Sequence, residues 1–197
     1  DLIGNDNIEQ VILNGEARSA GLEFMVRKIT GRLKGWLSYT LSRSEQRALG
    51  RTTDEPGINN GNWYYSPWDK THDISVSAIY DLSERWQLST NLVYQTGRPW
   101  TFPSGQFIFN EISVPRFEGR NLNRLTDFHR LDVAFIYNPK PKAERWKSQW
   151  VFSIYNLYNR RNANSFNFER NEISGNNEVT RLAIFGAVPS VTYNIKF

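Results

Sequence analysis

The residue types that could carry out chemistry gather first around residue 70. Asp69, His72 and Asp73 bring two carboxylates and an imidazole into one short segment, and such groups are ligands for metal ions. The chain has only 2 His and no Cys, however, and the spacing matches no known metal motif. We therefore favour the interpretation that Asp73 lies on the polar face of a new strand, with His72 at its rim.

A second cluster, His129-Arg130-Leu131-Asp132, contains groups that acid–base catalysis uses. In a strand, however, Arg130 and Asp132 would share one face, and we favour ion pairs between them and neighbouring strands. No segment combines a nucleophile, a base and an oxyanion hole, and the sequence has no glycine-rich phosphate loop. The sequence thus predicts a protein that is not an enzyme and that holds no cofactor and no metal.

Aromatic residues are concentrated in two polar segments that are expected to form long loops. Their rings could stack on a sugar or dock on a partner, but a girdle at a membrane interface explains them as well, and we favour the girdle for the first segment. For the second segment, a partner surface and packing over the mouth of the fold remain equal alternatives. The candidates for a ligand or partner loop are Trp63, Tyr64, Tyr65, Trp68, Trp100 and Phe102.

The composition limits the class of protein. Hydrophobic residues are 39% of the 197 residues, mean hydropathy is −0.58, and no apolar run approaches the roughly 18 residues of a membrane-spanning helix. The net charge of +4 comes from scattered residues without a basic tract, which argues against binding to nucleic acid. Aromatic residues reach 14%, which suits either a membrane barrel or a soluble β-sandwich or lectin.

The elements that must position these residues are β-strands with one apolar and one polar face. At the end of the chain Val191, Tyr193, Ile195 and Phe197 alternate with polar residues, which is the period of two typical of a strand. Six similar segments are expected near residues 20–27, 33–44, 71–81, 86–95, 128–138 and 147–158, with a further hairpin formed by 165–169 and 179–185.

The connections between these seven strands alternate between short turns and long loops. Outer-membrane barrels have this arrangement, with short turns on the periplasmic side and long loops outside. Polar residues also recur where the core of a soluble sandwich would need apolar ones. The sequence therefore predicts an all-β fold, an antiparallel transmembrane β-barrel, with Asp73, Arg130 and Asp132 facing its lumen.

Seven is an odd number of strands, whereas bacterial single-chain barrels have an even number. We therefore expect residues 1–197 to be the C-terminal part of a larger barrel. Residues 1–16 would be an incoming loop, and residues 17–197 would hold the strands, the periplasmic turns and the extracellular loops. A plug domain and the earlier strands are expected outside this chain.

Several segments, in this order, resemble the C-terminal barrel region of TonB-dependent outer-membrane transporters, particularly those of Bacteroidetes-type bacteria. The resemblance covers most of the chain from about Ala20 onward. The segments that carry it are Gly35–Ser44, Pro67–Asp73, Gly97-Arg98-Pro99, Phe128–Val133, Tyr155–Asn162 and Val188–Phe197.

This resemblance implies a barrel of about 22 strands around a plugged lumen, located in the outer membrane of a Gram-negative bacterium. It implies energised uptake of a nutrient and the following partners: the remainder of the barrel and its plug, outer-membrane lipid, TonB and a surface lipoprotein lid. It also implies that the barrel-assembly machinery recognises Val191, Tyr193, Ile195 and Phe197.

Two alternatives to transport remain. A receptor-like barrel could act as a scaffold for surface lipoproteins or for an outer-membrane complex. A soluble carbohydrate-binding β-domain is the less favoured alternative, because it explains neither the sorted connections nor the polar strand faces.

Overall fold

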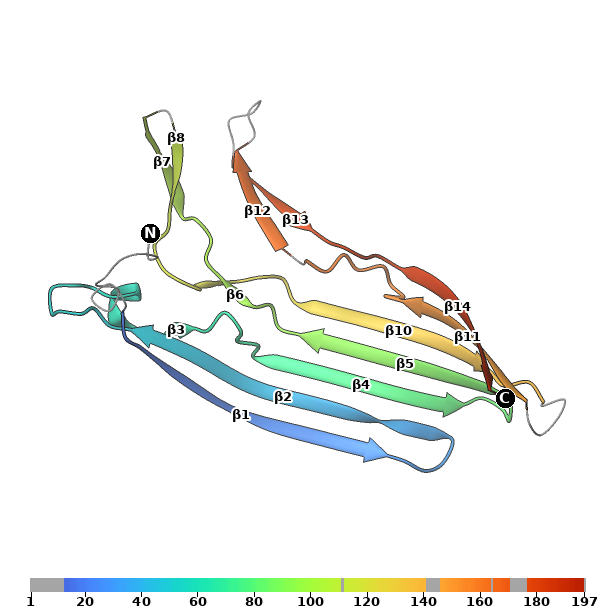
Figure 1. Ribbon diagram of the computed structural model, residues 1–197. Helices are drawn as coiled ribbons and strands as arrows, with labels where there is room; N and C mark the ends of the chain where they lie inside the picture. The colour runs from blue at the N-terminus through green and yellow to red at the C-terminus, as the bar shows by residue number, and fades with distance from the viewer. Residues whose placement is uncertain (1–12, 111, 141–145, 164, 171–176, 197) are drawn as a thin grey trace. The chain divides into compact units, whose positions relative to one another are not determined.

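The fold was analysed in a computed structural model, which describes residues 13–110, 112–140, 146–163, 165–170 and 177–196 (Figure 1). Within these ranges the chain is all-β, and the only helical element is a 3-10 turn, η1 (Asn59–Gly61). None of the described helices has the length and apolar character needed to cross a membrane.

A single large sheet contains the seven long strands. They are β1 (Gly15–Lys28), β2 (Leu33–Ala48), β4 (His72–Asp81), β5 (Trp86–Gln95), β10 (Phe128–Tyr137), β11 (Lys147–Tyr155) and β14 (Val188–Lys196). The strand order is β1-β2-β4-β5-β10-β11-β14, and the short strand β3 (Tyr64–Tyr65) also pairs with β2. The neighbouring strands from β2 to β14 pair antiparallel. The predicted all-β antiparallel fold is therefore confirmed, and in this sheet β1 and β14 are the two edges rather than neighbours in a closed ring.

The remaining strands lie inside the long connections. They are β6 (Pro99–Trp100), β7 (Gly105–Phe109), β8 (Ile112–Arg116), β9 (Asn123–Arg124), β12 (Ser165–Arg170) and β13 (Asn177–Leu182). β12 and β13 pair as the hairpin predicted from the sequence. The segment after β5 differs from the expected irregular loop, because β6 pairs with β9 and β7 pairs with β8.

The first strand also begins earlier than its apolar alternation suggests. β1 starts at Gly15 rather than at Ala20. The additional residues are polar, and their side chains reach β2: Arg18 contacts Glu45, and Arg47 contacts Glu16. Cross-strand polar pairs therefore extend the strand beyond its apolar part.

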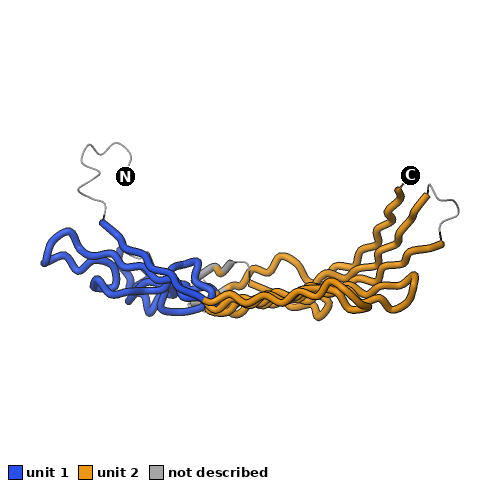
Figure 2. Tube along the Cα trace, turned by 90° about the horizontal axis from the view of Figure 1, so that it is seen from below, with its two compact units in different colours: residues 1–21, 42–70, 98–125 blue, residues 22–41, 71–97, 126–197 orange. Residues whose placement is uncertain are grey.

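The chain divides into two compact units, coloured separately in Figure 2. Unit 1 consists of residues 1–21, 42–70 and 98–125, and unit 2 consists of residues 22–41, 71–97 and 126–197.

One face of the sheet in unit 2 is apolar, because the antiparallel registers align the apolar residues of successive strands in rows. Two such rows are Leu33-Tyr80-Leu88-Phe135-Phe152-Val191 and Leu37-Val76-Leu92-Leu131. Along each strand, the residues that alternate with these apolar residues point to the opposite face. That opposite face carries Ser75, Ser77, Ser89, Asn91, Gln95, Arg130, Asp132 and Ser153.

The apolar face of unit 2 is not covered by other described residues. In the described part of the chain only Ala48, Tyr64 and Leu125 are buried hydrophobic residues, and all three belong to unit 1. Large side chains such as Phe135 and Val191 remain exposed, at 46% and 63%. Among the described residues, unit 2 therefore has one apolar and one polar sheet face, and its apolar face is a larger exposed patch than soluble monomers usually carry.

Candidate functional site

The apolar face of unit 2 ends in a row of aromatic side chains at the turn side. The row consists of Trp86, Tyr137, Trp150 and Tyr193, aligned across four strands. The ring centroids of Trp86 and Tyr137 are 4.7 Å apart, and those of Trp150 and Tyr193 are 4.5 Å apart. The turn-side end of the apolar face is therefore lined, across four adjacent strands, by side chains that combine an apolar ring with a polar N–H or O–H group.

A second row, aromatic at three of its four positions, borders the same face at the loop side. Tyr39, Ile74, Tyr94 and His129 occupy aligned positions on β2, β4, β5 and β10. The Tyr39 hydroxyl is 2.9 Å from Nδ1 of His72, and the Tyr158 hydroxyl is 2.8 Å from Nδ1 of His129. Trp86 and Tyr94 lie at opposite ends of β5, about 26 Å apart at a rise of about 3.3 Å per residue.

The residues considered for a metal site have other partners. The buried Asp69 carboxylate accepts hydrogen bonds from the Ser44 amide and from Arg124, whereas His72 contacts Tyr39 and Asp73 accepts a hydrogen bond from Gln95. No group of three or more metal-ligating side chains occurs among the described residues.

The three residues predicted to face a lumen all lie on the polar face of the sheet. Asp73 is opposite Gln95 on β5. Arg130 and Asp132 form an ion pair with each other at 3.0 Å. Arg130 also donates to the Tyr155 hydroxyl, and Asp132 accepts from the Asn156 backbone amide. These hydrogen bonds connect the polar face of β10 to the end of β11.

A second polar network in unit 2 is centred on Asp127, and no sequence pattern predicted it. Its carboxylate accepts hydrogen bonds from the Gly97 amide at 2.9 Å and from the Tyr94 hydroxyl at 2.7 Å, and Arg160 donates to its backbone carbonyl. The Gly97 amide and the Tyr94 hydroxyl lower the pKa of the Asp127 carboxyl below its ordinary value. These contacts tie the ends of β5 and β10 to the loop that follows β11.

In unit 1 the predicted aromatic loop forms an ordered cluster with arginines. The guanidinium carbon of Arg18 lies 4.2 Å from the centre of the Trp63 ring, and that of Arg47 lies 4.9 Å from it. Arg43 and Arg124 contact Tyr65 in the same way, at 5.3 and 4.5 Å. Cation–π contacts of this kind stabilise the loop by about 0.5–1 kcal/mol each.

Two buried carboxylates complete this cluster. Glu45, which is 6% exposed, accepts hydrogen bonds from both Arg18 and Arg43. Asp69, which is 1% exposed, joins Arg124 to the backbone of Ser44. The cluster therefore holds residues 63–69 against the loop-side part of β2.

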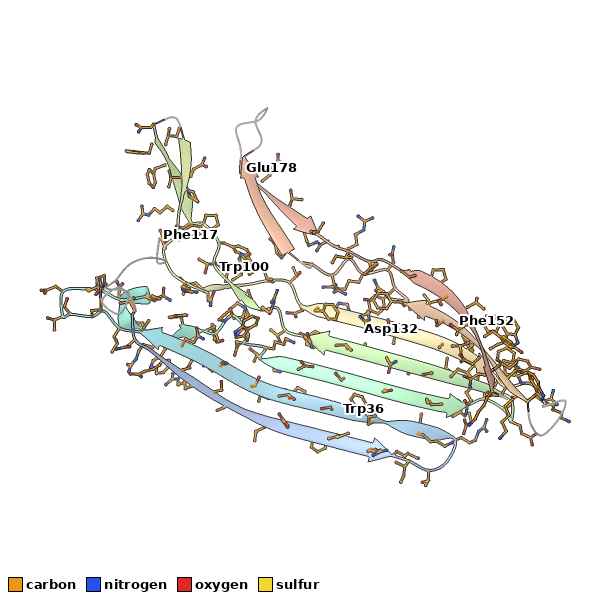
Figure 3. All side chains as sticks on the ribbon, in the orientation of Figure 1. Trp36, Trp100, Phe117, Asp132, Phe152 and Glu178 are labelled. Atoms are coloured by element: carbon orange, nitrogen blue, oxygen red, sulfur yellow. The ribbon has the colours of Figure 1, made fainter. Side chains whose placement is uncertain are left out.

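The remaining residues of the predicted loop differ in their surroundings. Tyr64 is buried, at 7% exposure, whereas Trp68 is 72% exposed. Trp100 lines a groove of about 610 Å³ together with Phe117, and Figure 3 shows both residues beside the β7–β8 hairpin. Phe102 is partly exposed and does not line this groove.

Asn121 also lines the groove, and it was not among the residues predicted from the sequence. Asn121 has a φ of +57° and is 6% exposed. Its side-chain amide donates to the Tyr65 carbonyl, and its backbone amide donates to the Thr101 hydroxyl. Asparagine tolerates the left-handed conformation, and this is the one signal that could have identified it.

The last strand presents the predicted C-terminal pattern on one face. Val191, Tyr193 and Ile195 are exposed, at 63%, 49% and 50%, while Phe197 lies outside the described residues. β14 pairs with β11 along its full length. Comparisons of the chain with protein-family models, with curated proteins and with solved structures find no match.

Proposed function

We propose that this chain forms strands of a transmembrane β-barrel in a bacterial outer membrane, and that the barrel belongs to a TonB-dependent transporter. One observation carries the membrane assignment: an uncovered apolar face bounded by two aligned aromatic rows. The segment of β5 from Trp86 to Tyr94 has close to the roughly 9–11 residues with which a tilted strand crosses a bilayer.

The polar face of the sheet supports a watery lumen. Ser77, Asn91 and Asp132 are aligned on three neighbouring strands of that face. Such residues would be costly in the dry core of a soluble sandwich, but they suit the interior of a large barrel.

Cysteine accessibility tests the membrane placement, because the chain contains no Cys. Val76→Cys introduces a thiol on the apolar face, and Ser77→Cys introduces a matched thiol on the polar face. In membranes that contain the full-length protein, a water-soluble maleimide is expected to label the thiol at position 77 and not the thiol at position 76. Equal labelling of both thiols would contradict a membrane-spanning sheet.

Transport is supported by the groove in unit 1, which joins aromatic and polar side chains. Trp100 and Phe117 supply ring surfaces, and Arg120 and Asn121 supply polar groups. A nutrient ligand would be captured here and released inward when TonB acts on the plug. The double variant W100A/F117A of the full-length protein is expected to reduce ligand uptake at least tenfold while leaving the amount of folded barrel unchanged.

A scaffold function is favoured by one specific observation. Phe107, Ile108 and Phe109 of the β7–β8 hairpin are 52%, 67% and 63% exposed. An isolated hairpin is marginally stable in water, so a surface lipoprotein that covers these residues would account for them. If W100A/F117A leaves uptake unchanged and F107S/F109S removes a co-purifying lipoprotein, the results favour a scaffold function over transport.

A further inference from the structure

The loop-side parts of β1 and β2 carry more arginine than their carboxylates neutralise. Arg18 and Arg43 share a single carboxylate, that of Glu45, whereas Arg47 has Glu16 to itself. On β1 and β2, the guanidinium groups of Arg18, Arg43 and Arg47 therefore face only two carboxylates. The side chains of Arg18 and Arg43 remain 57% and 63% exposed, so the excess positive charge is accessible from outside.

Both arginines also retain hydrogen-bonding capacity. Each uses its Nε and Nη2 atoms on Glu45. For neither guanidinium does Nη1 have a hydrogen-bond partner among the described residues. Guanidinium groups favour the oxygen atoms of phosphate, which they can bind through paired N–H donors.

The side-chain alternation of β2 gives the direction in which these groups project. Leu37, Leu41 and Arg43 occupy odd positions of one strand and therefore lie on the same side of it. Arg43 is the second residue after Leu41 in this strand. In the proposed barrel, an arginine just beyond the lipid-facing residues of a strand would extend its guanidinium toward the lipid headgroups.

The neighbouring aromatic side chains restrict the arginines in this position. Arg18 lies over Trp63 and Arg43 lies over Tyr65, and both rings belong to the loop that Asp69 holds against β2. Trp and Tyr are enriched at the membrane interface. The cluster thus combines exposed positive charge with interfacial aromatic groups and little freedom to move.

We propose that Arg18 and Arg43 bind the phosphate group of an anionic glycolipid headgroup in the outer leaflet of the membrane. This inference rests on the proposed membrane location. It differs from a purely internal role, in which the arginines only brace the loop, because it requires an external phosphate.

Lipid binding to the full-length protein in detergent tests this proposal. The probes are bisphosphorylated lipid A and the same lipid without its phosphates, and native mass spectrometry measures the bound fraction. We expect the wild-type protein to bind the phosphorylated lipid at least tenfold more tightly than the dephosphorylated one. Equal binding of the two lipids would overturn the proposal, whatever the variants do.

Variants then assign the binding to these residues. R18Q/R43Q is expected to lose the preference for the phosphorylated lipid, and R18K/R43K is expected to keep part of it because the charge remains. R51Q removes an arginine of the same unit that pairs with Glu55 and serves as the matched control. If R18Q/R43Q does not assemble, the single variant R43Q tests the same site, because Arg18 still pairs with Glu45.

Two further outcomes have defined meanings. If inorganic phosphate at millimolar concentration displaces the lipid completely, the site binds free anions and the assignment to a lipid is wrong. If maleimide labels positions 76 and 77 equally, the membrane placement itself fails. A lipid preference that is absent although position 76 is protected contradicts only the present inference.

Discussion

The ionisation of Asp127 is expected to make the stability of the folded protein depend on pH. Hydrogen bonds from Gly97 and Tyr94 keep its pKa below the ordinary value, so the folded state binds its proton less readily than the unfolded state. The resulting stabilisation is present at pH values above the unfolded pKa of about 4 and is lost as the pH falls through the folded pKa.

The variant D127N is therefore expected to be less stable than the wild type at pH 7, by about 1 kcal/mol after allowance for solvent screening. The difference between the two proteins should shrink as the pH falls below about 4. Thermal unfolding of the full-length protein in detergent, measured from pH 3 to pH 8, checks this. A difference that stays constant with pH would contradict the role of the carboxylate.

Asp69 connects the 63–69 loop to the backbone of β2 and to Arg124. Its side chain is fully buried, and D69A would leave both Arg124 and the Ser44 amide without this acceptor. Removing one partner of a buried ion pair costs about 3 kcal/mol or more. Limited proteolysis of the full-length protein is expected to cut D69A within residues 49–71 at least tenfold faster than the wild type.

Glu55 offers the matched control for this experiment. It lies in the same connection and pairs with Arg51 at the surface. E55A is therefore expected to be cut at the wild-type rate. Equally rapid cleavage of both variants would mean that the loop is held by something other than the Asp69 contacts.

Residues on strands could be assigned to a face from the sequence, but residues in loops could not be assigned to a network. Asp73, Arg130 and Asp132 lie on the polar face because alternation along a strand is strictly local. The partners of Asp127 and Asn121 come from distant parts of the chain. No local pattern encodes such contacts.

The two faces of β5 require different side chains, apolar ones on one face and polar ones on the other. Leu92 is aligned with Val76 and Leu131 in an apolar row, whereas Asn91 is aligned with Ser77 and Asp132. A charge at the middle of a lipid-facing strand costs about 2–4 kcal/mol, but a charge facing a lumen costs little.

The pair of variants L92R and N91R tests this difference on adjacent residues. We expect L92R to reduce the amount of heat-modifiable, folded protein in the outer membrane several-fold. N91R should assemble like the wild type, because Asp132 is its neighbour. If N91R is the more damaging of the two, the assignment of the faces is inverted.

The long strands and the hairpin β12–β13 were predictable from alternation, and the short pairs β6–β9 and β7–β8 were not. Prolines at positions 99 and 115 obscured the latter, since proline within a run argues against a strand. The extra length of β1 was also missed, because polar cross-strand pairs leave no apolar period.

At the scale of the whole molecule, the sheet has two edges, β1 and β14, that are not paired with each other in its strand order. Unpaired edges cannot remain in a bilayer, where every backbone group needs a partner. In the proposed membrane location, β1 and β14 would therefore pair with strands other than these seven.

Residues 1–197 expressed alone and purified in detergent are accordingly expected to give associated, protease-sensitive material. Size-exclusion chromatography and proteolysis measure both properties. A monomeric, protease-resistant barrel would show that β1 and β14 can pair directly. The barrel proposal would then need only these seven strands.

Unit 2 has no buried hydrophobic residue among those that the structure describes, and in the proposed barrel this has a consequence for how stability is defined. There, the apolar rows between Trp86 and Tyr94 would be buried by lipid rather than by the chain. The free energy of unfolding then varies with the thickness of the surrounding bilayer, and hydrophobic mismatch costs a fraction of a kcal/mol per ångström. The spacing between the two aromatic rows would thus set the bilayer thickness at which the protein is most stable, and the protein would accumulate in membranes of that thickness.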